Sequence, residues 1–147
     1  MDADAVAEWN HSWAGVEADI WITLGIEPVT ADRDGVVMKM PFKPEIGQAT
    51  GVFSAGALVQ LADVAATWLC ALRLRDSGAP DGTFPYAVQL SANLVANTDH
   101  GDARAGARLI SAGRTVMVTH TEVRDDDQRV LLTLTGTHVV RSPRPAE

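Results

Sequence analysis

A single carboxylate, Asp63, stands out among the residues that could do chemistry, because it lies inside a long apolar run. The stretch 54–74 is rich in Ala and Leu and contains no proline, so it is predicted to form one helix. Gln60, Asp63 and Thr67 follow at spacings of three and four, which places them on one narrow polar stripe. A buried carboxylate is costly unless it is paired, and no Lys or Arg stands three or four positions from Asp63. Either a group outside the helix satisfies Asp63 as a structural acid, or this carboxylate serves chemistry.

Small residues precede this helix, in the segment Gly51-Val52-Phe53-Ser54-Ala55-Gly56. First-turn amides have no acceptor inside a helix, and together with the positive end of the helix dipole they can receive a carbonyl oxygen or an oxyanion. Ser54 could equally act as an ordinary N-cap, with small neighbours that allow close packing. The pattern leaves open both an oxyanion site and simple helix capping.

These two features lie too far apart to act together within one chain. Asp63 follows Ala55 by eight residues, which corresponds to about 12 Å along a helix. That separation exceeds hydrogen-bonding range for a shared carbonyl group. Two such helices lying antiparallel across a two-fold axis would bring Asp63 of one protomer near Ala55 of its partner. The spacing therefore predicts that function requires a dimer.

Other candidate nucleophiles and metal ligands have less support. The residues around Ser54 half resemble a nucleophile elbow, but they lack the first glycine of G-x-S-x-G and a preceding apolar strand. Cys70 has no histidine nearby in the sequence and is predicted to be a buried apolar thiol. The histidines lack metal-ligand spacing, so no metal or other cofactor is predicted, and the last two are interpreted as ordinary strand residues. They are His11, His100, His120 and His138.

Apolar periodicity and turn signals predict an α+β fold of one domain. The predicted elements are one or two helices within 3–24, strands at 26–30 and 36–40, a loop at 43–52, the helix at 54–74, and strands at 86–94, 103–109, 115–123 and 130–140. Since the 54–74 helix is apolar on nearly every side, an antiparallel sheet of about six strands should wrap around it. We expect a single domain over 1–147, with an N-terminal helical segment at 1–25, a core at 26–140 and a frayed tail at 141–147.

Composition disfavours several classes of protein. With 46% hydrophobic and 21% charged residues, the chain is neither disordered nor fibrous in character. A net charge of −7 argues against nucleic-acid binding, although arginines gather from Arg104 onward and could bind a phosphorylated cofactor. A membrane span is disfavoured because Asp63 near the helix centre costs about 3 kcal/mol on insertion. The lone cysteine and an acidic N-terminus without signal-peptide character favour the cytoplasm.

Over residues 26–140 the sequence resembles the hot-dog fold acyl-CoA thioesterases, most closely the branch of 4-hydroxybenzoyl-CoA and phenylacetyl-CoA thioesterases. The stretch SAGALVQLAD carries the likeness, since it is similar to that branch's His-Gly-Gly motif followed by Leu-Ala-Asp. The resemblance implies that Asp63 is the catalytic acid and that the amides of Ala55 and Gly56 polarise the thioester carbonyl. It also implies that Gln48 orients the thioester or the water, and that Thr67 positions the nucleophile.

Further positions follow from the same resemblance. The segment from Asn93 through Gly101-Asp102 and the segment Gly113-Arg114-Thr115 are similar to strand-to-strand segments of the family. The second of these commonly lies near bound CoA, so Arg114 is a candidate phosphate contact. Ser54 occupies the place of the motif's histidine, beside the substrate, and Ala55 still supplies an amide where the family has glycine. Ala87 stands where some members have an alternative catalytic serine.

The resemblance implies an acyl-CoA thioesterase that works as a homodimer or a dimer of dimers, without a metal. Asp63 would be the nucleophile or the general base, and the other subunit would supply the oxyanion donors. A non-catalytic acyl-CoA-binding hot-dog protein is the main alternative. A hot-dog dehydratase or hydratase is less favoured, because such enzymes need a histidine paired with the acid, and the central loop and helix contain none.

Overall fold

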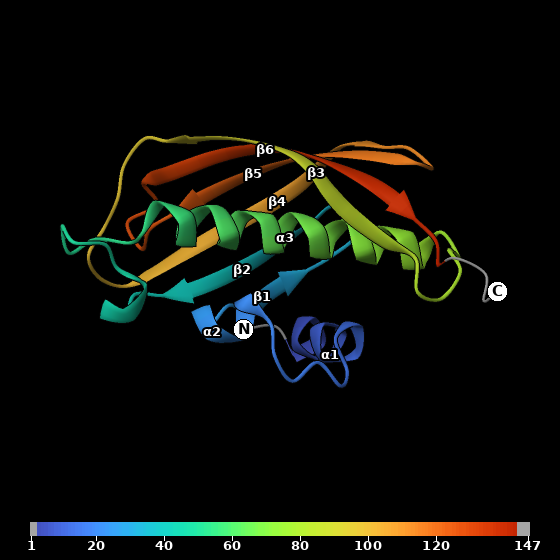
Figure 1. Cartoon of the computed structure of the whole chain (residues 1–147), viewed down its shortest axis with the longest axis horizontal. Helices are drawn as coiled ribbons and strands as arrows, with labels where there is room; N and C mark the ends of the chain where they lie inside the picture. Colours follow the sequence, from blue (N-terminus) through green and yellow to red (C-terminus); the bar gives the residue numbers. More distant parts are fainter. Residues whose placement is uncertain (1–2, 144–147) are drawn as a thin grey trace.

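The computed structural model describes residues 3–143, in which a six-stranded antiparallel sheet wraps around one long helix (Figure 1). The elements are α1 Ala3–Ser12, α2 Ile20–Leu24, β1 Glu27–Ala31, β2 Gly35–Pro41, the 3-10 turn η1 Pro44–Ile46, α3 Ala55–Asp76, β3 Phe84–Leu94, β4 Asp102–Ala112, β5 Val116–Arg124 and β6 Val130–Arg141. The strand order is β1-β2-β4-β5-β6-β3. The predicted α+β architecture is confirmed.

The predicted elements are present, and the differences lie at their ends. β6 continues to Arg141, which the sequence assigned to a frayed tail, because its last residues pair with Phe84 and Pro85 of β3. Residues 144–147 of that tail, and residues 1–2 of the N-terminal segment, lie outside the described residues. The predicted loop at 43–52 contains the short turn η1.

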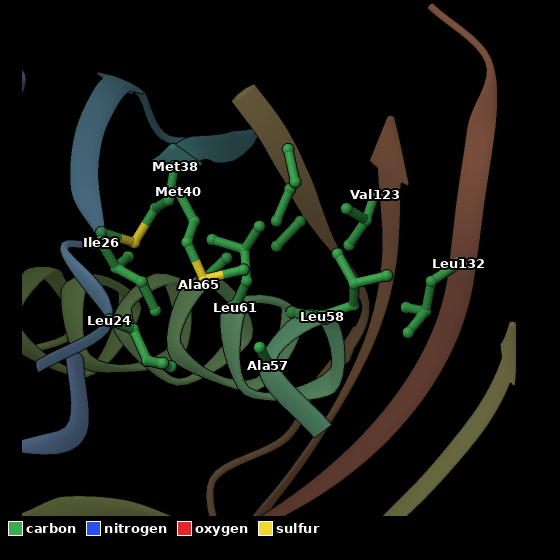
Figure 2. Close-up of a cluster of buried hydrophobic side chains, with 14 of the residues drawn as sticks. Leu24, Ile26, Met38, Met40, Ala57, Leu58, Leu61, Ala65, Val123 and Leu132 are labelled. Atoms are coloured by element: carbon green, nitrogen blue, oxygen red, sulfur yellow. The ribbon is translucent and has the colours of Figure 1, made fainter. Parts of the chain in front are cut away.

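The core lies between α3 and the concave face of the sheet. Figure 2 shows Leu58 and Leu61 of α3 pointing toward strands, where Met38 and Met40 of β2 and Val123 of β5 meet them. All five side chains are fully buried. By length and apolarity α3 would also pass as a membrane span, but more than half of that apolar stretch is buried inside this fold. Burial against the sheet therefore explains its composition.

Strand β3 stands at one end of the strand order and is an edge strand of eleven residues. Its register against β6 shifts between Ala87 and Gln89, so that Ala87 lies opposite His138 and Leu90 lies opposite Gly136. Residues directly opposite each other in an antiparallel pair share a face. The bulge inserts one residue and reverses the alternation, so Tyr86 lies on the opposite face from Leu90.

Three tryptophans of the N-terminal segment pack together. The Trp9 ring makes edge-to-face contacts with Trp13, Trp21 and Trp68, at centroid distances of 5.8, 5.0 and 5.0 Å. Trp68 belongs to α3, so this cluster joins α1 and α2 to the central helix. An ion pair between Glu8 and Arg75 joins α1 to α3 a second time. The segment is thereby held against the carboxyl-terminal half of α3.

Candidate active site

Asp63 opens into a cleft of about 310 Å³ between α3, the N-terminal segment and the start of β3. Its walls are rich in aromatic side chains, contributed by Trp9, Trp13, Trp21, Phe84 and Tyr86. Its polar side chains are Asp19, Gln60, Asp63 and Thr67. An apolar cleft with few polar groups around one carboxylate is the usual form of a site for a small organic molecule.

The carboxylate of Asp63 is half-buried, and burial is the main cause that raises its pKa above the ordinary aspartate value. A hydrogen bond from Thr67 Oγ1 to Asp63 Oδ1, at 3.5 Å, acts in the opposite direction. Across residues 3–143, Asp63 forms no ion pair with Lys, Arg or His. A structural acid held by an arginine or by backbone amides therefore does not describe it, whereas a desolvated carboxylate is a stronger base and nucleophile.

A histidine from the sheet joins this group, and the sequence interpretation missed it. His138 of β6 is fully buried, and its Nε2 lies 3.4 Å from Thr67 Oγ1. The interpretation of His138 as an ordinary strand residue was incomplete. A signal was present in the alternation of the strand. It puts His138 on the inner face together with Leu132, Leu134 and Gly136, where a histidine is unusual.

The amino terminus of α3 presents the second half of the expected chemistry. Ala55 and Gly56 are exposed and form its first turn, where backbone amides have no acceptor within the helix. Within the described residues the Ser54 side chain makes no capping hydrogen bond, so these amides are available to a ligand. Neither Ala55 nor Gly56 lines the cleft of Asp63. One chain therefore holds the carboxylate and the amides apart, as the helix spacing predicted.

Comparison with known proteins identifies the family. The family model described as the thioesterase superfamily matches residues 50–132, more than half of the chain and including all of α3. The chain belongs to the thioesterase superfamily. It is a thioester hydrolase. A 1,4-dihydroxy-2-naphthoyl-CoA hydrolase of Listeria monocytogenes is 25% identical to it over 122 residues, which cover 83% of this chain and 95% of that protein.

Solved structures establish the hot-dog fold of this thioesterase. A thioesterase from Haemophilus influenzae superposes with a TM-score of 0.83 at 21% identity, covering 95% of this chain and 92% of that one. A mutant thioesterase from Pseudomonas aeruginosa superposes with a TM-score of 0.80 at 23% identity, covering 95% of each chain. The six-stranded sheet, the central helix and the N-terminal helices are thus the expected parts of this fold.

Most of the other residues that the resemblance singled out lie outside the Asp63 cleft of the thioesterase. Gln48 is exposed in the loop before α3 and donates to Thr50 Oγ1 at 2.8 Å. Asn93 is exposed on the edge strand β3. Arg114 and Thr115 are exposed in the turn between β4 and β5. Their roles stay predictions, since the structure brings only Thr67 next to the carboxylate.

Three further features concern Cys70, metal binding and a larger hollow. Burial raises the pKa of the Cys70 thiol to about 12, so this cysteine is a neutral buried group at physiological pH. Residues 3–143 contain no cluster of three or more His, Cys, Asp or Glu side chains that could hold a metal ion. A larger hollow of about 560 Å³ lies away from Asp63 and carries charged side chains that pair among themselves, such as Arg124 with Glu122.

Proposed function

We propose that this thioesterase hydrolyses an acyl-CoA to the free acid and CoA, with Asp63 as the catalytic carboxylate of a homodimeric enzyme. The position of Asp63 carries the proposal. It is a half-buried carboxylate with a raised pKa, it opens into an apolar cleft, and its recorded partner is the Thr67 hydroxyl. The amides of Ala55 and Gly56 in the partner protomer are the proposed oxyanion donors.

The reaction can follow two routes from this arrangement. As a general base, Asp63 takes a proton from water, the hydroxide adds to the thioester carbonyl, and collapse of the tetrahedral intermediate breaks the C–S bond. As a nucleophile, Asp63 adds to the same carbonyl, CoA thiolate leaves, and water hydrolyses the resulting anhydride. In both routes the carbonyl oxygen becomes negative, and two α3 amides would stabilise that charge.

The exposed edge of the sheet supports the dimer. Tyr86, Val88, Leu90 and Leu94 of β3 are exposed large apolar side chains, with Val88 at 60%. A long apolar edge strand is a template for pairing with another chain, and monomeric proteins usually cover such an edge or place charges on it. Antiparallel pairing of two β3 strands across a two-fold axis would continue the sheet and place the two α3 helices antiparallel. A dimer of dimers would repeat the same site.

The side chains that line the cleft favour a substrate with an aromatic acyl group. Five aromatic side chains line it, and Phe84 contacts both Trp13 and Tyr86 edge to face. Aromatic rings favour such contacts with a further ring over those with a flexible alkyl chain. The related Listeria hydrolase is named for a naphthoyl group, which is also aromatic. We therefore propose an aromatic acyl-CoA as the preferred substrate.

A second cleft has side chains suited to binding the phosphates of CoA. This cleft, of about 460 Å³, lies at the carboxyl-terminal end of α3 and is lined by Arg73, Arg114 and the hydroxyl-bearing residues Ser77, Thr83 and Ser142. Guanidinium groups and hydroxyls are suited to phosphate oxygens. Arg114, implied by the family resemblance, is proposed as a phosphate contact here.

Hydrolysis of a short panel of aromatic, short-chain and long-chain acyl-CoAs by the wild type and Asp63→Asn tests the function. Both proteins should be compared at matched fold and oligomeric state. We expect the wild type to release CoA, fastest with aromatic substrates, and Asp63→Asn to lose at least a hundredfold in kcat. Unchanged hydrolysis by the variant would remove Asp63 from the mechanism. Tight binding without hydrolysis by the wild type would favour an acyl-CoA-binding protein.

A further inference from the structure

His138 is a buried titratable group that the mechanism above does not use. Its side chain is fully buried, and its Nδ1 is a buried atom without a hydrogen-bond partner among the described residues. Polar side chains are rarely buried in this way without a specific contact. The contact that His138 does make, from Nε2 to Thr67 Oγ1, connects it to the carboxylate of Asp63.

The surroundings of His138 keep its ring neutral. Burial lowers its pKa below the ordinary histidine value. Three elements pack around His138. The helix α3 contributes Thr67, which contacts Asp63, while β5 contributes Thr119 and β3 contributes Ala87. Cys70 of α3 packs against Met117, the residue opposite His138, and its thiol is neutral. A neutral imidazole carries one N–H, so only one of its two nitrogens can donate.

The hydrogen bonds of Thr67 decide which nitrogen that is. Its hydroxyl has one proton, and the structure has this proton donated to Asp63 Oδ1. The lone pairs of Thr67 Oγ1 then face His138 Nε2, which must be the protonated nitrogen for a hydrogen bond to form. This leaves Nδ1 as an acceptor without a partner, which is less costly than a buried N–H without one.

We propose that His138 is a positioning residue, which donates from Nε2 to Thr67 Oγ1 and thereby keeps the Thr67 hydroxyl directed at the Asp63 carboxylate. This inference rests on the proposed role of Asp63 in the hydrolysis. Contacts of 3.4 and 3.5 Å are long for hydrogen bonds, as catalytic contacts often are before a substrate closes the site.

Gly136 keeps the space that this arrangement needs. It lies two residues before His138 on the same buried face of β6. A Cβ at Gly136 would lie 3.2 Å from His138 Cε1 and 3.0 Å from Thr119 Oγ1. Both contacts are tighter than ordinary van der Waals distances, so a side chain here would push the ring or the hydroxyl away. The absence of a side chain at 136 therefore helps to fix the ring beside Thr67.

Loss of the Nε2 donor has a specific consequence for Asp63. Without it, the Thr67 hydroxyl is free to rotate away from the carboxylate. Since the hydrogen bond from Thr67 lowers the pKa of Asp63 against the effect of burial, weakening it raises that pKa further. The ionised form of Asp63 then appears at higher pH, and the acidic limb of activity moves upward. A purely structural role would lower the yield of folded protein without moving this limb.

Dependence of kcat and KM on pH in four variants tests the proposal. His138→Gln places an amide N–H near the position of Nε2, while His138→Asn places it near Nδ1 and His138→Leu removes the donor. We expect His138→Gln to retain most activity. His138→Asn and His138→Leu should lose about tenfold in kcat, the size of effect of one hydrogen bond to a charged group. Both should move the acidic limb upward with KM changed less than twofold. Thr121→Val is the matched control, since it removes a buried hydroxyl that has no partner in residues 3–143.

A double-mutant cycle with Thr67→Val separates a positioning role from a direct one. If His138 acts through Thr67, His138→Asn should have little further effect in the Thr67→Val background. Equal additive losses, or an acidic limb that stays in place in all His138 variants, would overturn the proposal. Asp63→Asn, measured beside them, separates the proposed function from the proposed role of His138. Full activity of Asp63→Asn contradicts the proposed function itself. If Asp63→Asn is inactive, the His138 variants decide the positioning role.

Discussion

At the scale of single residues, burial of the Asp63 carboxylate disfavours its charged form and makes it more basic. Its pKa is raised chiefly because the fold removes water from the carboxylate, and the Thr67 hydroxyl compensates only in part. The folded state therefore binds the Asp63 proton more tightly than the unfolded state does. The stabilising contribution of the protonated form is fully present below the unfolded-state pKa and is lost as the pH rises through the raised folded-state pKa.

This linkage predicts that Asp63→Asn is more stable than the wild type at pH 7. We expect a gain of about 1 kcal/mol in the free energy of unfolding, because the variant removes a charge that burial disfavours. The gain should shrink as the pH falls toward 4, where the wild-type carboxyl is protonated. Thermal denaturation at the two pH values measures it. Asp81→Asn, at an exposed loop position, is the control and should show no such gain.

The same shift predicts the pH profile of catalysis. As base or nucleophile, Asp63 acts in its ionised form, so kcat/KM should fall as the pH drops through its pKa. We expect the midpoint of this acidic limb to lie above the range of an ordinary aspartate, since burial raises the pKa. Initial rates of thioester cleavage over pH 4 to 8 measure it. A limb at the ordinary aspartate value would show that the site is more hydrated when active.

At the scale of elements, the N-terminal segment shapes the cleft, while the central helix carries the proposed catalytic carboxylate. The family match begins at residue 50, yet the N-terminal segment supplies Trp9 of α1, Trp13 of the turn after it and Trp21 of α2 to the cleft of Asp63. The edge-to-face contact between Trp9 and Trp68 ties that segment to α3. Under the proposed function, selectivity for the acyl group can therefore vary through the N-terminal segment without any change in the proposed catalytic carboxylate.

Trp21→Leu tests whether the N-terminal segment affects acyl-group selectivity separately from the reaction at Asp63. The change keeps an apolar side chain but removes the aromatic face, and edge-to-face contacts are worth about 1 kcal/mol each. We expect KM for aromatic acyl-CoAs to rise severalfold while kcat changes little, because uniform binding is lost and the reacting groups are untouched. Ile22→Ala serves as control, since Ile22 neighbours Trp21 in α2 but is exposed and does not line the cleft. An equal loss with short-chain substrates would contradict the aromatic preference.

At the scale of the whole molecule, the proposed site requires two chains. Eight residues of α3 separate the carboxylate from the first amide, a span of about 12 Å. The open apolar edge at β3 is where a second chain would pair. Catalysis and assembly should therefore fail together.

Lysine on the edge strand should break the assembly. We expect Val88→Lys to shift the protein from dimer to monomer in light scattering, because a charge on an exposed edge opposes strand pairing. Hydrolysis should fall in parallel, while the monomer keeps its fold by circular dichroism. Val116→Lys is the control, as Val116 is also exposed but lies at the start of β5, away from the edge. A fully active monomer would refute a shared site.

Complementation between two inactive variants tests the shared site directly. Ala55 is the first residue of α3, and Ser54 before it has extended backbone angles, so Ala55→Pro removes the amide N–H at a position where helices accept proline. Asp63→Asn and Ala55→Pro should each lose a hundredfold or more. Mixed after unfolding and refolding, half of the dimers are heterodimers with one intact site of two, which restores about a quarter of wild-type activity. A site built within one chain would restore none.

Local patterns in the sequence determined most of the architecture. Apolar periodicity predicted the helices and strands, and the uninterrupted apolar run at 54–74 required a sheet around it, because a helix apolar on every side must be buried. The isolated carboxylate at Asp63 indicated a candidate site, and its spacing from Ala55 predicted two chains, a prediction that stays open. These conclusions depend on neighbours within a few turns or one strand, which a sequence displays directly.

Only the tertiary structure decided which distant residues meet Asp63. The aromatic wall combines α1, α2 and β3, and His138 reaches Thr67 from a strand 71 residues later in the chain. The bulge at Ala87 to Gln89 reversed the face of Tyr86, since one inserted residue inverts a two-residue period. Such contacts are set by strand order and register, which depend on packing of the whole sheet against α3. Strand alternation puts His138 on the inner face, but local spacing carries no record of which side chain it meets there.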